Sequence, residues 1–313
     1  MRIWRKWWVW LLIVLVVVPA GYMTYVYQSI KSTANQIYEE REEGLPPVVP
    51  VSTVEQNVPV KPNKLKNADQ PVPFTVLMLG VDERPNDRGR SDTLMLMAVN
   101  PAKGSIMMFN VPRDTRTSIV GHGKVDKINH AYAFGGVDMS IRSVENFLQY
   151  PIDYYVKVNM EGFSQIIDSL GGVTVRNQME FDYAGYHFGE GILKLSGEEA
   201  LAYSRMRFED PKGDLGRNAR QREIIKGILD NAMKITTVFK LEVLLDDVGG
   251  SVKTDISFDE MKRFVTDYLQ KLERIDQVEI QGHGQTIDGI WYYIVDQSEK
   301  ERIHSLLSDF MGG

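Results

Sequence analysis

The chain contains no cysteine and has five histidines among its 313 residues. Without cysteine it can form neither a disulfide bond nor a thiolate metal site. The histidines show no zinc-binding spacing such as HExxH, so we interpret each as a loop or surface residue. They are His122, His130, His187, His283 and His304. Disulfide scaffolds are therefore excluded, and zinc-dependent chemistry is disfavoured.

The chain also lacks an excess of positive charge. Its 36 lysines and arginines are outnumbered by 42 aspartates and glutamates, which gives a formal net charge of −6. Three of the basic residues lie within the first six positions, so the chain beyond residue 27 is more acidic still, at −9. Bulk attraction to nucleic acid or to anionic lipid is not expected, and no nucleic-acid partner is predicted.

An uncharged run from Trp7 to Tyr27 follows these basic residues. Its 21 residues match the roughly 20 that a membrane-spanning helix needs, with tryptophans at one end and tyrosines at the other. The basic flank predicts a cytoplasmic tail over residues 1–6, an anchor in the cytoplasmic membrane over residues 7–27, and an extracytoplasmic remainder. The alternative is a cleaved signal peptide, with Val18-Pro19-Ala20 imitating its cleavage site. The apolar run continues past that point, which favours the anchor.

Residues 28–73 are predicted to be an extracytoplasmic linker. Residues 28–45 look helical and charged, whereas residues 46–73 hold seven of the thirteen prolines. That composition predicts an extended, semi-rigid spacer. Nothing from Phe74 onward resembles a linker, so residues 74–313 are predicted to be one domain, and we expect a monomer.

Strand and helix patterns alternate through this domain. Residues 74–80 and 93–99 are nearly continuous apolar runs, typical of central strands covered on both faces. Further strands are expected at 105–111, 153–159, 172–176, 277–281 and 290–295. Helices are expected at 137–149, 161–169, 197–203, 214–234, 237–247, 257–272 and 297–310. The alternation predicts an α/β fold, a three-layer α/β/α sandwich around a mixed central sheet.

Acidic residues bracket the loop between the first two strands. If these strands are antiparallel neighbours, Asp82 and Asp92 reach the same edge of the sheet, and the third strand brings Arg113 back to it. Two carboxylates about 4 Å apart would repel by about 4 kcal/mol at an effective dielectric of about 20. A divalent cation removes that cost, and an oxygen-only site suits Mg²⁺. The alternative is that each aspartate is a turn or cap residue.

The segment SRMRFEDPKGDLGRNARQRE, residues 204–223, concentrates five arginines in this acidic chain. The helix before it is expected to end near Tyr203, which would leave Arg205 and Arg207 on an extended segment. Residues two apart on such a segment share one face. Both guanidinium groups would then point toward the same ligand.

A second helix is expected to start near Asp214. It would place Arg217, Arg220 and Gln221 on one face, while Arg222 points elsewhere. Arginine forms bidentate hydrogen bonds with phosphate, so the cluster predicts a phosphate site. Ion pairing with neighbouring acids is the alternative, and it is favoured for Arg220 and Arg222.

Eight stretches resemble the LytR-CpsA-Psr family of wall-polymer ligases. In order, they are LMLGVDER, GRSDTLMLMAVNP, VPRDTR, DKINHAYAFGG, DYYVKVNMEGF, LGGVTV, LSGEEALAYSRMR and GDLGRNARQREII. They cover about residues 74–230, and the single N-terminal span also matches. Each motif alone is modest, but eight in the family's order are specific. Beyond about residue 235 the resemblance rests on length and helical character.

The resemblance implies a phosphotransferase outside the cytoplasmic membrane of Gram-positive bacteria. Such an enzyme moves an anionic polymer, for example wall teichoic acid, from an undecaprenyl-pyrophosphate carrier to a sugar hydroxyl of peptidoglycan. Asp82 and Asp92 match the family's metal-binding acids, which implies Mg²⁺. Catalytic roles are implied for Arg113, Arg90 and Asp92. The implied pyrophosphate-binding shell is Arg90, Arg113, Arg116, Lys127, Asn129, Arg205, Arg207, Arg217 and Gln221.

Other functions and details stay open at this point. The same site would admit water and act as a polyprenyl-pyrophosphate hydrolase, or it would hold a lipid phosphate without turnover. A pure binder needs the arginines but not the two aspartates. The general base is either Asp92 or Asp114. The carrier's apolar tail needs a groove, for which the candidates are Phe134, Phe147, Ile224 and Ile228, with plain core packing as the alternative for each.

Overall fold

The computed structural model describes residues 7–41, 70–83, 89–233 and 250–312. The helix predicted over residues 237–247 lies outside the described residues, and so does most of the predicted proline-rich spacer.

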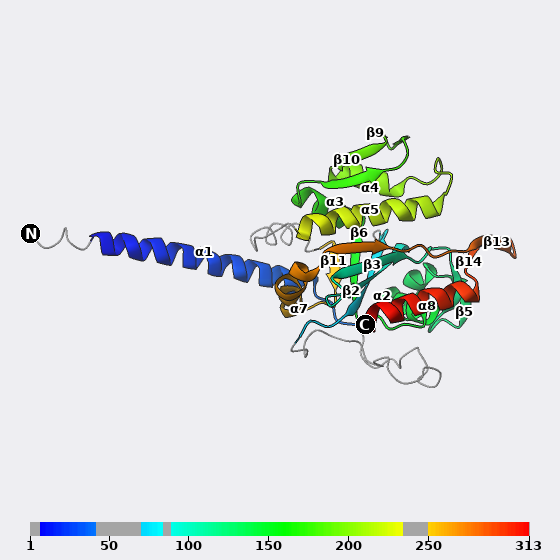
Figure 1. Ribbon diagram of the computed structural model, residues 1–313, viewed down its shortest axis with the longest axis horizontal. Coiled ribbons are helices and arrows are strands. Elements are labelled where there is room, and N and C mark those ends of the chain that lie inside the picture. The colour runs from blue at the N-terminus through cyan, green and yellow to red at the C-terminus, as the bar shows by residue number, and fades with distance from the viewer. Residues whose placement is uncertain (1–6, 42–69, 84–88, 234–249, 313) are drawn as a thin grey trace, which may run out of the picture.

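A six-stranded mixed sheet forms the centre of the molecule (Figure 1). From edge to edge its strands are β11 (Val252–Thr254), β6 (Tyr154–Asn159), β1 (Phe74–Val81), β2 (Ser91–Asn100), β3 (Ser105–Asn110) and β12 (Arg274–Gln277). β1, β2 and β3 are successive antiparallel neighbours, whereas β6 runs parallel to β1 and β12 parallel to β3. β11 pairs antiparallel with β6. This confirms the prediction of an α/β fold with a mixed central sheet.

Helices cover both faces of the sheet, because successive side chains of a strand point to opposite faces. The helices of the domain are α2 (His130–Leu148), α3 (Met160–Ser169), α4 (Gly197–Arg205), α5 (Asp214–Met233), α7 (Phe258–Arg263) and α8 (Gln297–Met311). Leu77 and Leu79 of β1 pack in one cluster with residues of α2 and α8. Met95 and Met108 pack on the other face with Ile225 of α5. In Figure 1, α5 lies above the sheet and α2 and α8 lie below it.

Short two-stranded sheets lie outside the six-stranded central sheet. They are β4 (Arg116–Ile119) with β5 (Lys124–Lys127), β7 (Val173–Asn177) with β10 (Gly191–Leu195), β8 (Phe181–Tyr183) with β9 (Tyr186–Phe188), and β13 (His283–Ile287) with β14 (Ile290–Ile294). A second hydrophobic cluster lies under β7–β10 and joins them to α3, α4 and α5 through Ile167, Tyr203 and Ile224. The cluster holds α4 and α5 as a rigid cover over the end of the central sheet.

Helix α1 (Trp7–Ile37) leads from the N-terminus into the domain (Figure 1). Its last turns bury Val26, Ile30 and Ala34, and Tyr38 just beyond it forms a β-bridge with Thr254. In the described part of the chain, no helix has both the length and the apolar character needed to cross a membrane. The predicted anchor over residues 7–27 therefore stays a prediction.

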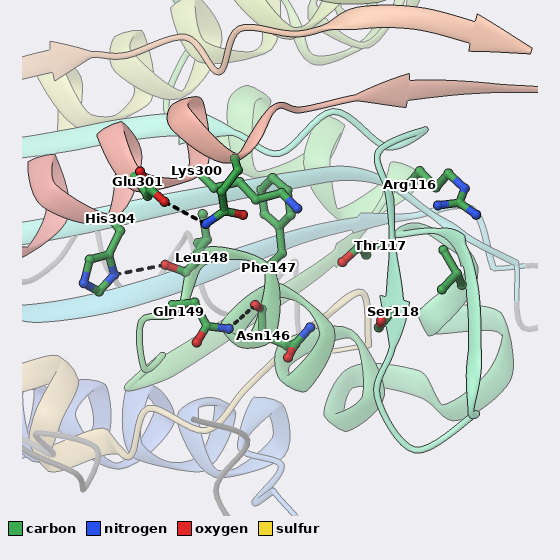
Figure 2. A pocket seen from close by; sticks show the side chains of 12 residues that line it. Arg116, Thr117, Ser118, Asn146, Phe147, Leu148, Gln149, Lys300, Glu301 and His304 are labelled. Atoms are coloured by element: carbon green, nitrogen blue, oxygen red, sulfur yellow. Dashed lines mark hydrogen bonds between the residues drawn. The ribbon is translucent and has the colours of Figure 1, made fainter. Parts of the chain in front are cut away.

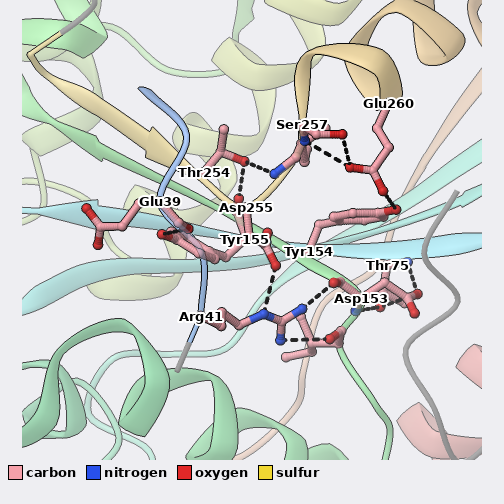
Figure 3. A network of polar contacts seen from close by, with 12 residues as sticks. Glu39, Arg41, Thr75, Asp153, Tyr154, Tyr155, Thr254, Asp255, Ser257 and Glu260 are labelled. Atoms are coloured by element: carbon pink, nitrogen blue, oxygen red, sulfur yellow. Dashed lines mark hydrogen bonds and ion pairs between the residues drawn. The ribbon is translucent and has the colours of Figure 1, made fainter. Parts of the chain in front are cut away.

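Arg41 fastens this N-terminal segment to the domain (Figure 3). Its Nε donates to Asp255 Oδ2 at 2.7 Å, its Nη1 donates to the carbonyl of Ile152 at 3.1 Å, and its Nη2 donates to the carbonyl of Asp153. Asp255 is 1% exposed and also accepts from the backbone N–H of Tyr155 at 2.8 Å. Residues 28–41, predicted as the start of the linker, therefore belong to the folded body.

Several predicted boundaries differ from the structure. The strand expected at 277–281 is β12, which lies earlier, at Arg274–Gln277. The helix expected over 257–272 consists of α7, a π-helical turn over Phe264–Tyr268 and a 3₁₀ turn over Leu269–Lys271. The short strands β8 and β9, of three residues each, give too little periodicity to be recognised from sequence.

Candidate functional site

The loop between β1 and β2 holds two acidic residues at one end of the central sheet. The backbone N–H of Asp82 donates to the carbonyl of Arg90 at 3.4 Å, across the start of that loop. Gly89 has a φ of 68°, and a Cβ at this position would overlap the carbonyl of Asp82, so the close approach requires glycine. Asp82 and Asp92 line the same cavity. The convergence that the strand order predicts is therefore present.

This cavity has a volume of about 410 Å³ and lies between strands β1, β2 and β6 and helices α3, α4 and α5. Its polar lining includes Asp82, Asp92, Arg205, Arg207, Arg217 and Gln221. Its apolar lining includes Met78, Met95, Met160, Phe163, Leu201 and Ile225. Six of the predicted site residues therefore meet in one cavity. The lining suits a ligand with an anionic head and an apolar tail, because both surfaces are within its reach.

Arg113 lies just beyond β3 and joins three carboxylates. Its Nη1 donates to Asp92 Oδ1 at 2.8 Å, and its Nε lies 3.6 Å from Asp214 Oδ1 and 3.7 Å from Asp114 Oδ2. Burial lowers the pKa of Arg113, but the three carboxylates together outweigh burial and raise that pKa above its ordinary value. The guanidinium is therefore a permanent positive charge beside the cavity.

Arg217, in the first turn of α5, is the most deeply buried arginine of the cavity lining, with 7% of its surface exposed. Its Nη2 lies 2.7 Å from Asp214 Oδ1, but the angles there do not make a hydrogen bond, and both Nε and Nη2 are buried without a hydrogen-bond partner among the described residues. Burial lowers the pKa of Arg217, and Arg113 lowers it further, while Asp214 raises it. Buried N–H groups without acceptors are costly, so an anion in the cavity would relieve them.

Helix α5 starts at Asp214, as expected, but the sequence did not predict the position of Asp214 between Arg113 and Arg217. Its Oδ1 faces both Arg113 and Arg217. A carboxylate shared by two guanidinium groups holds them near each other and offsets their mutual repulsion. The only sequence signal was its place in the motif GDLGRN.

The remaining predicted residues of the loop after β3 lie beside Arg113. Lys127 Nζ forms an ion pair with Asp114 Oδ1 at 2.7 Å. The backbone N–H of Asn129 donates to the carbonyl of Arg113 at 3.2 Å. Asn129 is 4% exposed, and its Oδ1 has no hydrogen-bond partner in the described part of the chain. Lys127 and Asn129 therefore support the loop that carries Arg113, and their contact with a ligand stays a prediction.

The extended geometry expected for residues 204–208 is wrong in part. Helix α4 continues to Arg205, and the chain becomes extended only at Met206, whose φ and ψ are −58° and 135°. The guanidinium of Arg207 packs over the ring of Phe208, 4.4 Å from its centroid. Arg205 and Arg207 still line the same cavity, because the end of the helix turns the chain between them.

Besides Arg113, two further predicted arginines lie outside the cavity lining. Arg90 is exposed at the start of β2. Arg116, the first residue of β4, is also exposed, packs over the ring of Tyr292 at 5.8 Å from its centroid, and lines a second cavity. Their roles toward pyrophosphate stay predictions.

Arg220 is structural, as the ion-pair alternative expected. It is 6% exposed, and its Nη1 donates to Asp210 Oδ2 at 2.5 Å. Its Nε donates to the carbonyl of Tyr203 at 3.2 Å, and its guanidinium packs over the ring of Phe181. These contacts fix the end of α4 against α5.

Arg222 differs from its prediction as an ion-paired or solvated residue. It is 6% exposed, and burial lowers its pKa. Its Nε donates to Gln277 Oε1 at 3.3 Å, and its Nη1 donates to Asn110 Oδ1 at 3.1 Å. Asn110 Nδ2 in turn donates to Gln221 Oε1 at 3.3 Å. Because the side-chain oxygen Oε1 of Gln221 accepts within the protein, the side-chain nitrogen Nε2 of Gln221 is the group left to donate to a ligand in the cavity.

The apolar residues predicted to line a lipid groove do not line this cavity. Ile224 is fully buried in the cluster under β7–β10, and Ile228 packs beside it. Phe134 stacks on His122 at a centroid distance of 3.9 Å. Phe147 is core and lines the second cavity. The helix face that reaches the cavity is instead that of Ile225, one position along from Ile224.

A magnesium site was predicted at the two aspartates. In the described residues, no group of three or more histidine, cysteine, aspartate or glutamate side chains could hold a metal ion. Mg²⁺ commonly binds through one or two carboxylates plus substrate phosphates and water. Asp82 and Asp92 line the cavity with the arginines, so the pair fits that ion once a phosphate completes the site. The metal itself stays a prediction.

Comparisons with known proteins agree on one family. The profile of the LytR_cpsA_psr family matches residues 24–309. The polyisoprenyl-teichoic acid–peptidoglycan teichoic acid transferase TagU of Bacillus subtilis (strain 168) is 44% identical over 284 residues, 91% of this chain and 88% of that protein.

Solved structures agree with the sequence comparison. The crystal structure of B. subtilis TagU has a TM-score of 0.64 at 44% identity and covers 77% of this chain and 97% of that one. A structure of TagT bound to LIIa-WTA has a TM-score of 0.68 at 28% identity, with coverages of 80% and 95%. The matched residues include the central sheet, the cavity and the loops that carry its charged side chains. This chain therefore belongs to the LytR_cpsA_psr family.

Proposed function

We propose that this protein is an extracytoplasmic phosphotransferase that attaches an anionic wall polymer, wall teichoic acid or a similar one, to peptidoglycan. The donor is the polymer on an undecaprenyl-pyrophosphate carrier, and the acceptor is a sugar hydroxyl of the glycan. The related TagU is named as a transferase from polyisoprenyl-teichoic acid to peptidoglycan. This chain covers 88% of that protein's length at 44% identity.

One observation carries the proposal: a buried guanidinium with N–H groups that lack acceptors lies in a cavity that is also apolar. Arg217 is 7% exposed, and within the described ranges of the chain its Nε and Nη2 have no hydrogen-bond partner. The same cavity offers methionine, phenylalanine and isoleucine side chains. A polyprenyl pyrophosphate has the two matching parts, an anionic head for the arginines and a hydrocarbon tail for the apolar lining.

The reaction exchanges one P–O bond for another. The acceptor hydroxyl oxygen bonds to the phosphorus that carries the polymer, the bond from that phosphorus to the bridging oxygen breaks, and the carrier leaves as its monophosphate. The hydroxyl proton passes to a carboxylate, either Asp92 or Asp114. Arg113, beside the cavity, and the lining arginines Arg205, Arg207 and Arg217 stabilise the negative charge that develops on the phosphoryl oxygens, which is the main task in phosphoryl transfer.

The two candidate bases differ in their partners. Asp92 accepts from Arg113 at 2.8 Å and is also a candidate metal ligand, whereas Asp114 is held by Lys127 at 2.7 Å. Each candidate base therefore lies beside a cationic side chain. Mg²⁺, held by Asp82 and Asp92, would supply charge neutralisation at the phosphate oxygens.

The proposed location is the cytoplasmic membrane, with residues 7–27 as the anchor and the short basic N-terminus in the cytoplasm. The supporting observation is the order of basic residues followed by 21 uncharged residues. A carrier with a polyprenyl tail is itself a membrane lipid, so an anchored enzyme meets its donor at the membrane surface.

The test is a transfer assay with the full-length protein in detergent, a short-chain lipid-pyrophosphate donor and a soluble glycan acceptor. We expect carrier monophosphate and linked glycan to form in equal amounts, and EDTA or the double variant Asp82→Ala/Asp92→Ala to abolish both. Release of carrier monophosphate without linked glycan would identify a hydrolase. Donor binding without any release would identify a non-catalytic binder. Full activity in EDTA would remove the metal from the mechanism.

A further inference from the structure

A second cavity, of about 570 Å³, is lined by Arg116, which follows Arg113 by three residues along the chain (Figure 2). It is lined by β4, β5, the last turn of α2 and the first half of α8. None of its lining residues belongs to the lining of the first cavity. It is therefore a separate site, and the proposed donor chemistry does not use it.

Two cations face this second cavity from different elements. Arg116 comes from β4 and packs over the ring of Tyr292. Lys300 comes from α8, and its Nζ lies over the ring of Phe147, 5.5 Å from the ring centroid. Among the described residues, neither has a carboxylate within ion-pair distance. Both charges are thus available to an acidic group on a ligand.

The rest of the lining is made of neutral hydrogen-bonding groups and apolar walls. The neutral polar residues are Thr117, Ser118, Asn146, Gln149 and Gln297, and the apolar ones are Val125, Phe147 and Leu148. Amides and hydroxyls both donate and accept, which matches the hydroxyl and acetamido groups of a glycan. Apolar walls match the C–H faces of its sugar rings.

Internal hydrogen bonds hold these walls in place, as Figure 2 shows. His304 Nδ1 lies 3.2 Å from the carbonyl of Leu148, which ties α8 to the end of α2. Gln297 Nε2 donates to Glu301 Oε1 at 3.0 Å, and Gln149 Nε2 donates to the carbonyl of Asn146 at 2.6 Å. The first of these bonds joins α8 to α2, and the other two fix side chains within the start of α8 and the end of α2.

The loop after β3 connects the two cavities. Arg113 belongs to the first site and Arg116 to the second, and three residues of chain span at most about 11 Å. The backbone between them is fixed, because the N–H of Tyr293 donates to the carbonyl of Asp114 at 2.9 Å and Thr115 forms a β-bridge with Tyr293. A polymer bound in the second cavity can therefore extend to the reacting phosphate.

We propose that the second cavity binds the acceptor, a peptidoglycan strand with free carboxylates on its peptide stems. This inference rests on the proposed function, since it assigns the acceptor of the same reaction. Arg116 and Lys300 hold the carboxylate, the amides and hydroxyls hold the sugars, and the strand places one sugar hydroxyl at the first cavity.

The test compares Lys300→Ala with Lys124→Ala, a matched control. Lys124 is exposed on β5 beside this cavity but is not part of its lining. In the full-length protein, we expect Lys300→Ala to raise the KM for soluble uncrosslinked glycan about fivefold to tenfold, with the donor KM unchanged. The control should match the wild type. Thermal melting checks that both variants are folded.

A binding experiment separates failure of this inference from failure of the proposed function. Calorimetry with glycan fragments alone, without any donor, should show binding to the wild type that Lys300→Ala weakens by the same factor, whether or not the protein transfers polymer. No binding of the fragments, or equal binding by both variants, would overturn the inference. Lys300-dependent binding of glycerol-phosphate oligomers in place of glycan would also overturn it, in favour of the donor polymer.

Discussion

The cluster around Arg41 and the cluster around Arg217 both place an arginine beside an aspartate, but the two guanidinium groups differ in how many hydrogen bonds they make. Arg41 donates from all three of its nitrogens, to Asp255, Ile152 and Asp153 (Figure 3). Arg217 has Asp214 at 2.7 Å, yet its Nε and Nη2 make no hydrogen bond with any residue that the structure describes. The first cluster is complete within the protein, whereas the second leaves donors for something else.

The difference separates stability from function. A buried ion pair with all its hydrogen bonds made fastens two elements, and removing one partner leaves an unpaired charge. A buried guanidinium whose N–H groups lack acceptors lowers the stability of the ligand-free protein. The structure tolerates that cost around Arg217, where the cavity also contains apolar side chains and two acids. A ligand with phosphate oxygens would supply the missing acceptors.

The largest expected effect is at Arg217. Replacing it with alanine removes a preorganised charge at the reacting phosphate, which typically costs about 100-fold to 1,000-fold in rate. The lysine variant keeps the charge but loses the bidentate geometry, so we expect a loss of at least about tenfold, or about 1.4 kcal/mol. Because Nε and Nη2 of Arg217 make no hydrogen bond with the described residues, both variants should melt at nearly the same temperature as the wild type. Kinetics and melting curves measure both, and a large fall in melting temperature with normal turnover would contradict the comparison.

Arg41 should show the opposite pattern. Arg41→Ala leaves Asp255 buried at 1% exposure without its partner, and we expect the free energy of unfolding to fall by about 3 kcal/mol. Below the melting temperature, kcat/KM per folded molecule should stay within about twofold, since no residue of this cluster lines the first cavity. Chemical denaturation and the transfer assay test this. Loss of turnover in a variant that is still folded would mean that the N-terminal segment acts on the site.

Arg222 lies between these extremes, because its Nε and Nη1 donate within the protein and it is also linked to the cavity through Asn110 and Gln221. We expect Arg222→Lys to lower kcat/KM about fivefold, or about 1 kcal/mol, by releasing the amide of Gln221. In a Gln221→Ala background the same change should have no further effect. A double-mutant cycle measures this coupling, and additive losses would show that Arg222 acts only on stability.

The smallest expected effect concerns Glu145, which borders the Arg41 cluster. Its Oε1 accepts from the backbone N–H of Ile152 at 2.9 Å. Burial raises the pKa of Glu145 above its ordinary value of 4.5, although the Ile152 N–H and Arg41 partly offset this. A raised carboxyl pKa means that stability is present at low pH and is lost as pH rises through the folded-state pKa.

Glu145→Gln keeps the acceptor and removes the ionisation. Its free energy of unfolding, relative to that of the wild type, should therefore rise from about pH 4 to about pH 7. Urea titrations across this range provide the measurement. Parallel pH profiles for the two proteins would show that burial of this carboxylate has no effect on stability.

Some sequence predictions succeeded because they depended on strand order and local pattern. The apolar runs at 74–80 and 93–99 are β1 and β2, and an antiparallel pair must bring Asp82 and Asp92 to one edge. The prediction for Arg205 and Arg207 used the wrong local conformation and still placed both in the cavity. The prediction that Ile224 lines a groove for the carrier's apolar tail was wrong. A helix turns by about 100° per residue, and it is Ile225 that reaches the cavity.

The amino-acid sequence by itself determined the family, the mixed α/β fold, and the convergence of acids and arginines at one end of the sheet. These follow from motifs, hydrophobic periodicity and strand order, which are properties of short segments. Only the tertiary structure decided which arginines are structural and which have N–H groups without acceptors, because hydrogen-bond partners come from residues far along the chain. Arg41 meets Asp255, and Arg222 meets Asn110. Burial and hydrogen-bond geometry at such contacts exist only once the chain has folded.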